Sequence, residues 1–128
     1  MKKVAFIGTG NMGSALIKAA CKSLGGEEVA ITDHALDKAQ ALAQATGCTA
    51  YPDNRTCAQA AEYIFLCVKP HLIRVVLEEI APVLAGKVVV SIAAGVVTSD
   101  LHAWAGEKVP VLRIMPNPPC AIGKGMTA

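Results

Sequence analysis

Charged side chains are scarce in this sequence: Asp, Glu, Lys and Arg together make up 17% of its 128 residues. Soluble globular domains usually carry about 25%. Apolar side chains, in contrast, reach 53%. A chain of this length can form one domain with a real core, and the apolar excess indicates a surface that another part of a larger protein covers. We therefore expect residues 1–128 to be one domain, cut from a longer protein at its C-terminal end.

Long hydrophobic runs are also missing. No apolar run approaches the roughly 18 residues that a membrane-spanning helix needs. The apolar stretch that follows Met1 breaks at Gly8, so it is too short for a signal peptide. The formal net charge is only +2, the lysines are dispersed and no aromatic platform occurs, so nothing favours nucleic acid as a partner. These absences predict a cytoplasmic protein.

The cysteines lack the spacing of a metal site, because the sequence contains no C-x-x-C pair. The five cysteines are Cys21, Cys48, Cys57, Cys67 and Cys120. An odd number of scattered cysteines without a secretion signal is typical of reduced, mostly buried thiols. We expect no metal site.

Short apolar runs alternate with helical patterns along the whole chain. The predicted strands are residues 4–7, 28–32, 48–51, 63–68, 88–92 and 111–114. The predicted helices are residues 11–24, 35–45, 58–62, 70–84 and 100–105. This alternation is typical of a parallel sheet covered on both faces. It predicts an α/β fold of the doubly wound Rossmann type, with a mostly parallel six-stranded sheet in the order 3-2-1-4-5-6.

A glycine-rich turn follows the first predicted strand, with the sequence G-T-G-N-M-G at residues 8–13. Gly8 allows the tight turn, Gly10 lets the backbone approach a pyrophosphate, and Gly13 lets the helix pack close to the strand. The free N–H groups at the start of that helix then hold the phosphates. With the strand, the helix and an acid about 20 residues later, the pattern predicts a dinucleotide site. The alternative is an ordinary strand-to-helix turn.

The acid is Asp33, at the end of the second predicted strand. A carboxylate here normally accepts hydrogen bonds from the adenosine ribose, which favours NAD and repels the 2′-phosphate of NADP. The alternative role is a cap for the helix predicted at residues 35–45. His34 and Lys38 are weak candidates for a 2′-phosphate site, so the choice between NAD and NADP stays open.

Few other side chains indicate chemistry. Lys69 either orients a cofactor or substrate carboxylate, or is a solvated lysine before a helix. The three histidines, His34, His71 and His102, have no Asp or Ser partner at a suggestive spacing. We interpret them as surface residues and assign no catalytic residue.

Four segments together resemble pyrroline-5-carboxylate reductase, the last enzyme of proline synthesis. They are F-I-G-T-G-N-M-G at residues 6–13, L-C-V-K-P-H at 66–71, V-S-I-A-A-G at 90–95 and R-I-M-P-N-P-P at 113–119. The first is shared by many dehydrogenases, whereas the other three in this order are more specific. The resemblance spans nearly all of the chain.

The resemblance implies a Rossmann domain joined to a C-terminal helical domain, which is absent here and which builds the homo-oligomer and most of the substrate pocket. It implies that Asn117 lies near the nicotinamide and the substrate. It also implies cofactor contacts from Ile7, Gly8, Thr9, Gly10, Asn11, Met12, Asn54, Cys67, Val68, Lys69, Pro70, Ala93, Ala94 and Gly95. Asp33 puts a preference for NADPH in doubt. Two departures from the family are Pro118 in place of the usual threonine and the absence of the whole C-terminal domain.

The implied reaction is hydride transfer from NADPH or NADH to the C=N carbon of 1-pyrroline-5-carboxylate, which gives L-proline. The cofactor carries this chemistry while the protein orients and desolvates. We expect the 128 residues to bind cofactor but to be nearly inactive alone. One alternative is the cofactor domain of a 3-hydroxyacid dehydrogenase or an F420-linked reductase; another is a nucleotide-binding module without catalysis.

Overall fold

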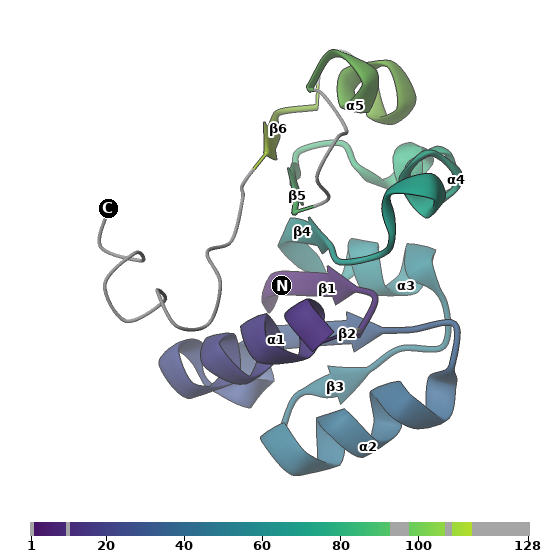
Figure 1. Ribbon diagram of the computed structural model, residues 1–128. Coiled ribbons are helices and arrows are strands. Elements are labelled where there is room, and N and C mark those ends of the chain that lie inside the picture. The colour runs from purple at the N-terminus through teal and green to yellow at the C-terminus, as the bar shows by residue number, and fades with distance from the viewer. Residues whose placement is uncertain (1, 10, 93–97, 107–108, 114–128) are drawn as a thin grey trace, which may run out of the picture.

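A computed structural model of the protein describes residues 2–9, 11–92, 98–106 and 109–113. Figure 1 shows its strands and helices. The strands are β1 (Lys2–Ile7), β2 (Val29–Thr32), β3 (Thr49–Ala50), β4 (Ala61–Leu66), β5 (Val88–Ser91) and β6 (Val111–Arg113). The helices are α1 (Asn11–Leu24), α2 (Leu36–Thr46), α3 (Asn54–Gln59), α4 (Pro70–Ile80) and α5 (Thr98–Ala105), with single 3₁₀ turns at Gly26–Glu28 and Ala81–Val83.

The six strands form one sheet in the order β3-β2-β1-β4-β5-β6. Every neighbouring pair is parallel, so the predicted fold class and strand order are confirmed. The central strands β1 and β4 are neighbours, although the chain visits β2 and β3 between them. In such sheets ligands bind beyond the carboxyl ends of the strands, where the strand order reverses. The topology therefore places the site beyond Ile7 and Leu66.

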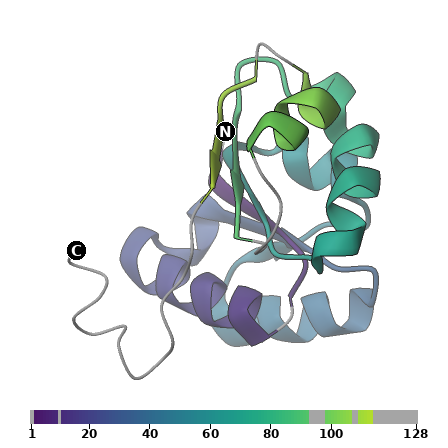
Figure 2. The same cartoon turned by 45° about the horizontal axis from the view of Figure 1, so that its top comes forward.

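The side chains of β1 alternate between two cores, because successive residues of a strand point to opposite faces. Ala5 and Ile7 belong to a buried cluster with α3, α4 and α5, whereas Val4 and Phe6 belong to a second cluster with α1 and α2. Figure 2 shows the two groups of helices on opposite sides of the sheet. Both faces of the central strands are thus covered, which explains their continuous apolar sequence.

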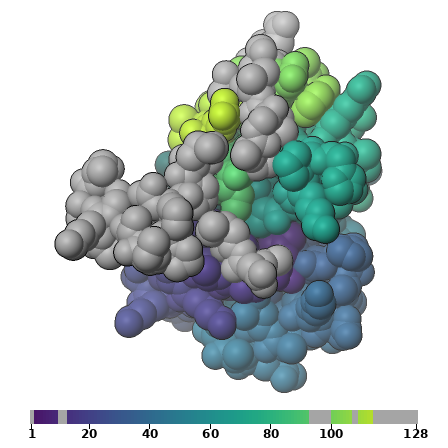
Figure 3. Space-filling view, in the orientation of Figure 1, coloured from purple at the N-terminus to yellow at the C-terminus, as the bar shows by residue number. Residues whose placement is uncertain are grey.

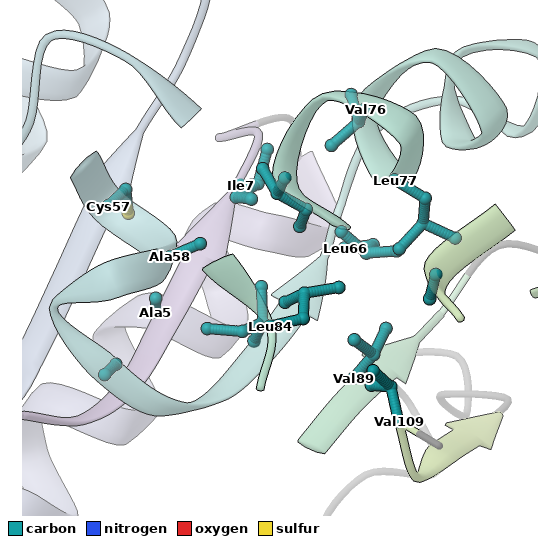
Figure 4. Close-up of a cluster of buried hydrophobic side chains, with 14 of the residues drawn as sticks. Ala5, Ile7, Cys57, Ala58, Leu66, Val76, Leu77, Leu84, Val89 and Val109 are labelled. Carbon is teal, nitrogen blue, oxygen red and sulfur yellow. The ribbon is translucent and has the colours of Figure 1, made fainter. Parts of the chain in front are cut away.

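Helix α4 contributes the largest part of the first cluster. Its buried residues Ile73, Val76, Leu77 and Ile80 recur every three or four positions, which is the spacing of one helix face. Figure 4 shows Leu77 beside Leu66 of the sheet. This packing holds the start of α4 next to the end of β4.

One predicted helix is wrong. Of the helix predicted at residues 58–62, only residues 58 and 59 are helical, because α3 spans Asn54–Gln59 and β4 already begins at Ala61. The cause is the cap: the Asp53 carboxylate accepts hydrogen bonds from the N–H of Thr56 (2.7 Å) and from its hydroxyl (3.0 Å), which starts the helix early. The residues Cys67 and Val68 consequently lie beyond β4 rather than inside it.

In the part of the chain that is described, no helix has both the length and the apolar character needed to span a bilayer.

We expect Leu77→Ala to lower the free energy of unfolding by about 2–5 kcal/mol, because it leaves a cavity in a packed core. Leu77 is fully buried, whereas Leu72, on the same helix, is 37% exposed. Leu72→Ala is the matched control and should cost less than about 1 kcal/mol. Urea unfolding measures both values, and equal losses would contradict the described packing of α4.

Candidate functional site

Two adjoining hollows open at the carboxyl ends of β1 and β4. Their volumes are about 450 and 400 Å³, within the usual range of ligand pockets. They form a single cleft, because they share the residues Gly8, Asp33, His34, Val68 and Leu72. In the space-filling view the surface around α2 is blue and that of α4 is teal (Figure 3), and the cleft takes residues from the starts of both helices.

The glycine turn packs directly on the loop that follows β4. The N–H of Cys67 donates a 2.8 Å hydrogen bond to the carbonyl of Ile7. A Cβ on Gly8 would lie 2.9 Å from the carbonyl carbon and oxygen of Cys67, and Gly8 has a φ of 100°. A Cβ on Gly13 would lie 2.8 Å from the Gly8 oxygen and 2.9 Å from the Cys67 Cβ. Glycine is therefore required at both positions, and α1 begins right at the cleft.

Three groups of Thr9, its N–H, its hydroxyl and its carbonyl, form hydrogen bonds with other residues. Its N–H and its hydroxyl donate hydrogen bonds of 2.7 and 2.6 Å to the same oxygen, Oδ2 of Asp33. Its carbonyl oxygen accepts a 2.7 Å hydrogen bond from the hydroxyl of Ser14 on α1. The first residue after Gly8 is thus fixed between the end of β2 and the first turns of α1.

The carboxylate of Asp33 is ionised at neutral pH. Burial by itself raises its pKa, but the hydrogen bonds from the Thr9 hydroxyl and from the N–H groups of Ala35 and Thr9, together with the nearby His34 ring, outweigh burial. The pKa therefore lies below the ordinary value of 3.8. Hydrogen bonds to the charged form explain this direction.

The first hollow has a basic lining. His34, Lys38, Lys69 and His71 all line it and are all exposed. Asp33 is the acidic residue among its lining residues, and its carboxylate is already hydrogen-bonded. A cleft with this charge attracts anions.

The second hollow has an apolar wall from one face of α4. Leu72, Val75, Val76 and Glu79 line it at spacings of three, four and seven residues, and Val75 is 62% exposed. Opposite them, the amide nitrogen of Asn54 donates a 2.8 Å hydrogen bond to Oε1 of Glu79. The sequence analysis assigned no site residue beyond Pro70 to the helix predicted at residues 70–84, and so missed this wall, although its helical spacing was visible.

Most of the predicted site residues that can be described meet in this cleft: Ile7, Gly8, Thr9, Asp33, Asn54, Cys67, Val68 and Lys69. Burial raises the pKa of Cys67 to about 12, so its thiol is not a nucleophile at neutral pH. Asn11 begins α1 and is followed by Met12. Pro70 is the first residue of α4 and is not among the lining residues of either hollow. Outside the described residues lie Gly10, Ala93, Ala94, Gly95 and Asn117.

The strand order and the glycine turn define the class: this is a Rossmann-type α/β domain. Residues 3–95 match the family described as NADP oxidoreductase, coenzyme F420-dependent. The chain belongs to that family.

Among known proteins, this chain is similar to pyrroline-5-carboxylate reductases. The chain is 36% identical over 132 residues to a pyrroline-5-carboxylate reductase of Corynebacterium melassecola, a match that covers 99% of this chain and 49% of that protein. A solved pyrroline-5-carboxylate reductase of Coxiella burnetii superposes with a TM-score of 0.86 at 31% identity, over 94% of this chain and 46% of that one. The pyrroline carboxylate reductase of Plasmodium falciparum, solved with NADP bound, gives a TM-score of 0.81 at 27% identity, over 95% and 45%.

These matches confirm the resemblance found in the sequence. They also show that the chain spans about half the length of the curated relatives it matches.

Acid should unfold the protein partly through Asp33. Its folded pKa lies below 3.8, so the folded chain binds fewer protons than the unfolded chain in this range, and the contribution of Asp33 is complete at neutral pH. That contribution is lost as the pH falls through 3.8 toward the lower folded value. Asp33→Asn should flatten the loss of stability below about pH 4, measured by urea unfolding between pH 2 and 7.

Thr9→Val should remove part of the same acid dependence, because the Thr9 hydroxyl helps to lower the pKa of Asp33. Asp53, whose pKa is also lowered by its hydrogen bonds to Thr56, remains in both variants and leaves a residual slope. An acid profile that neither substitution changes would contradict this account.

Gly13→Ala should destabilise the fold, although Gly→Ala within an open helix stabilises by about 1 kcal/mol. The added methyl would meet the Gly8 backbone and Cys67, so we expect a loss of about 1–3 kcal/mol through overpacking. Ala19→Gly, at an exposed position of the same helix, is the control and should lose about 1 kcal/mol through helix propensity. A stabilised Gly13→Ala variant would show that the turn is looser than described.

Proposed function

We propose that this chain is the cofactor-binding unit of a pyrroline-5-carboxylate reductase and that it binds NADPH or NADH along the carboxyl ends of β1 and β4. The observation that carries the proposal is the glycine turn packed on Cys67 beside a cleft with a basic lining. The relative from Plasmodium falciparum, solved with NADP bound, supports the same choice of cofactor.

The pyrophosphate fits the start of α1. Gly8 and Gly13 bring the first turn of that helix to the cleft, where free N–H groups and the helix dipole favour a doubly charged group. Lys69, at the other wall, adds a positive charge to the same hollow. We assign the phosphate contacts to the turn that contains Gly8, Thr9, Gly10, Asn11 and Met12.

The adenosine half fits the second hollow. Leu72 and Val75 form an apolar wall against which the adenine ring can pack. Asn54, whose side-chain amide is hydrogen-bonded to Glu79, provides a polar group in the same hollow. Ile7, Cys67, Val68 and Pro70 would border the cofactor between the two halves. The contacts assigned to Ala93, Ala94 and Gly95, and the position of Asn117 near the substrate, rest on the family resemblance alone.

When bound, the reduced nicotinamide supplies the hydride that reduces the C=N bond of 1-pyrroline-5-carboxylate to L-proline. The task of the described residues is to hold and orient the cofactor. For the whole enzyme we propose a homo-oligomer in the cytoplasm that acts on this small cyclic imine.

The test is a calorimetric titration of the chain with NADPH, NADH and coenzyme F420. We expect saturable binding of at least one nicotinamide cofactor, and weaker binding by Lys69→Ala by roughly threefold to fivefold, the size of one exposed charge pair. Lys22→Ala, at the exposed end of α1, is the control and should bind like the parent chain. Binding of F420 alone would favour an F420-linked reductase, and a folded chain that binds none of the three would refute the proposal.

Activity gives a second readout. Because the chain spans about half the length of its relatives, we expect it to bind cofactor but to reduce 1-pyrroline-5-carboxylate very slowly when assayed alone. Rapid oxidation of NADPH in the presence of that imine would contradict this division of roles.

A further inference from the structure

The carboxylate of Asp33 borders the cleft, yet its side chain is largely covered by neighbouring residues. Its side chain is 9% exposed, whereas that of the next residue, His34, is 94% exposed. An acid at the end of the second strand selects NAD only if its oxygens are free to accept hydrogen bonds from the ribose hydroxyls. Whether Asp33 can select NAD therefore depends on which groups its two carboxylate oxygens already bond.

Both oxygens of Asp33 already have partners. Oδ2 accepts from the N–H and the hydroxyl of Thr9, at 2.7 and 2.6 Å. Oδ1 accepts from the N–H of Ala35 at 2.9 Å and lies 3.2 Å from Nδ1 of His34. A carboxylate has about four lone-pair sites; hydrogen bonds within the chain occupy three of them, and the His34 ring lies beside Oδ1.

We propose that Asp33 is a positioning residue that clamps Thr9 in the glycine turn, and that it does not select NADH by binding the ribose. The clamp has a second side, because Ser14 on α1 holds the carbonyl of Thr9. The backbone of Thr9 is thus fixed before any ligand arrives, which lowers the cost of binding a pyrophosphate. This inference rests on the proposed binding of a dinucleotide. It goes further by stating which residues distinguish NADPH from NADH.

If Asp33 does not bind the ribose, the residues just beyond it determine whether NADPH or NADH binds more tightly. His34 and Lys38 line the same hollow and are exposed. A 2′-phosphate near the end of β2 would meet these two basic side chains instead of a free carboxylate. NADPH should therefore bind at least as tightly as NADH.

Asp33→Glu separates the two roles because it keeps the charge. Either acid can bind a ribose, so a ribose-binding residue would tolerate the change and keep its affinity for NADH. Only a short side chain can bond the N–H of Ala35, two residues ahead. The extra methylene of Glu also moves the carboxylate from the position in which Oδ2 accepts from Thr9, so the clamp would be lost. We expect the Kd values for NADPH and NADH to rise together, each by roughly tenfold, the size of one hydrogen bond to a charged group.

Thr9 provides the partner variants. Thr9→Val removes the hydroxyl that bonds Asp33 and should weaken both cofactors in the same way, whereas Thr9→Ser should recover most of that loss. Thermal unfolding without cofactor tests the clamp by itself. The double variant with Asp33→Glu and Thr9→Val should unfold at the same temperature as Asp33→Glu alone, because both changes break one interaction.

Lys38→Ala tests selection. It should weaken NADPH by about threefold to fivefold and leave NADH unchanged, with Lys22→Ala as the matched lysine control. The ratio of the two affinities is a readout that a merely structural role of Lys38 would not move.

Three results would overturn the proposal: NADH bound tenfold or more tightly than NADPH by the parent chain, an Asp33→Glu variant that keeps its affinity for NADH, or additive losses of unfolding temperature in the double variant. If the parent chain binds neither cofactor, the proposed function fails instead, and the unfolding temperatures still decide whether Asp33 clamps Thr9.

Discussion

The close approach of the glycine turn to Cys67 is the constraint on which the site depends. A Cβ on Gly8 or on Gly13 would come within 3.0 Å of atoms of the neighbouring loop or turn, so the ends of β1 and β4 lie together only because both positions are glycine. The approach directs α1 to one face of the sheet and α4 to the other. The cleft lies beyond the carboxyl ends of β1 and β4, with lining residues from the starts of α2 and α4.

Much of this arrangement was predictable from the sequence, because it depends on local patterns. Short apolar runs with helical spacing between them predict a parallel sheet, and the handedness of such connections leaves few strand orders. The glycines at 8 and 13 stand where the fold needs them, for the steric reason that the structure shows. The motifs at residues 66–71 and 90–95 then identified the relatives, a step that rests on family resemblance rather than on physical reasoning.

What could not be predicted depends on contacts between residues far apart in the chain. The spacing of Asp33 from the glycines is the same whether its carboxylate faces a ribose or the backbone of Thr9, 24 residues earlier. The wall formed by Leu72 and Val75 was missed because a helix face is assigned to solvent or cleft only once its neighbours are placed. The early start of α3 was the exception, since the cap at Asp53 is a local signal that the sequence analysis overlooked.

The position of β1 in the sheet has a consequence for synthesis. Of the six strands of this sheet, β1 is synthesised first, yet it lies inside the sheet, with β2 on one side and β4 on the other. Its pairing with β4 joins Lys2 to Ala61 and Ile7 to Leu66, so one edge of the nascent strand stays open until residues 61–66 have been made. Parallel pairings of this range form slowly, and an open apolar edge invites association with other chains. The growing chain is therefore most exposed to aggregation before residue 66 emerges.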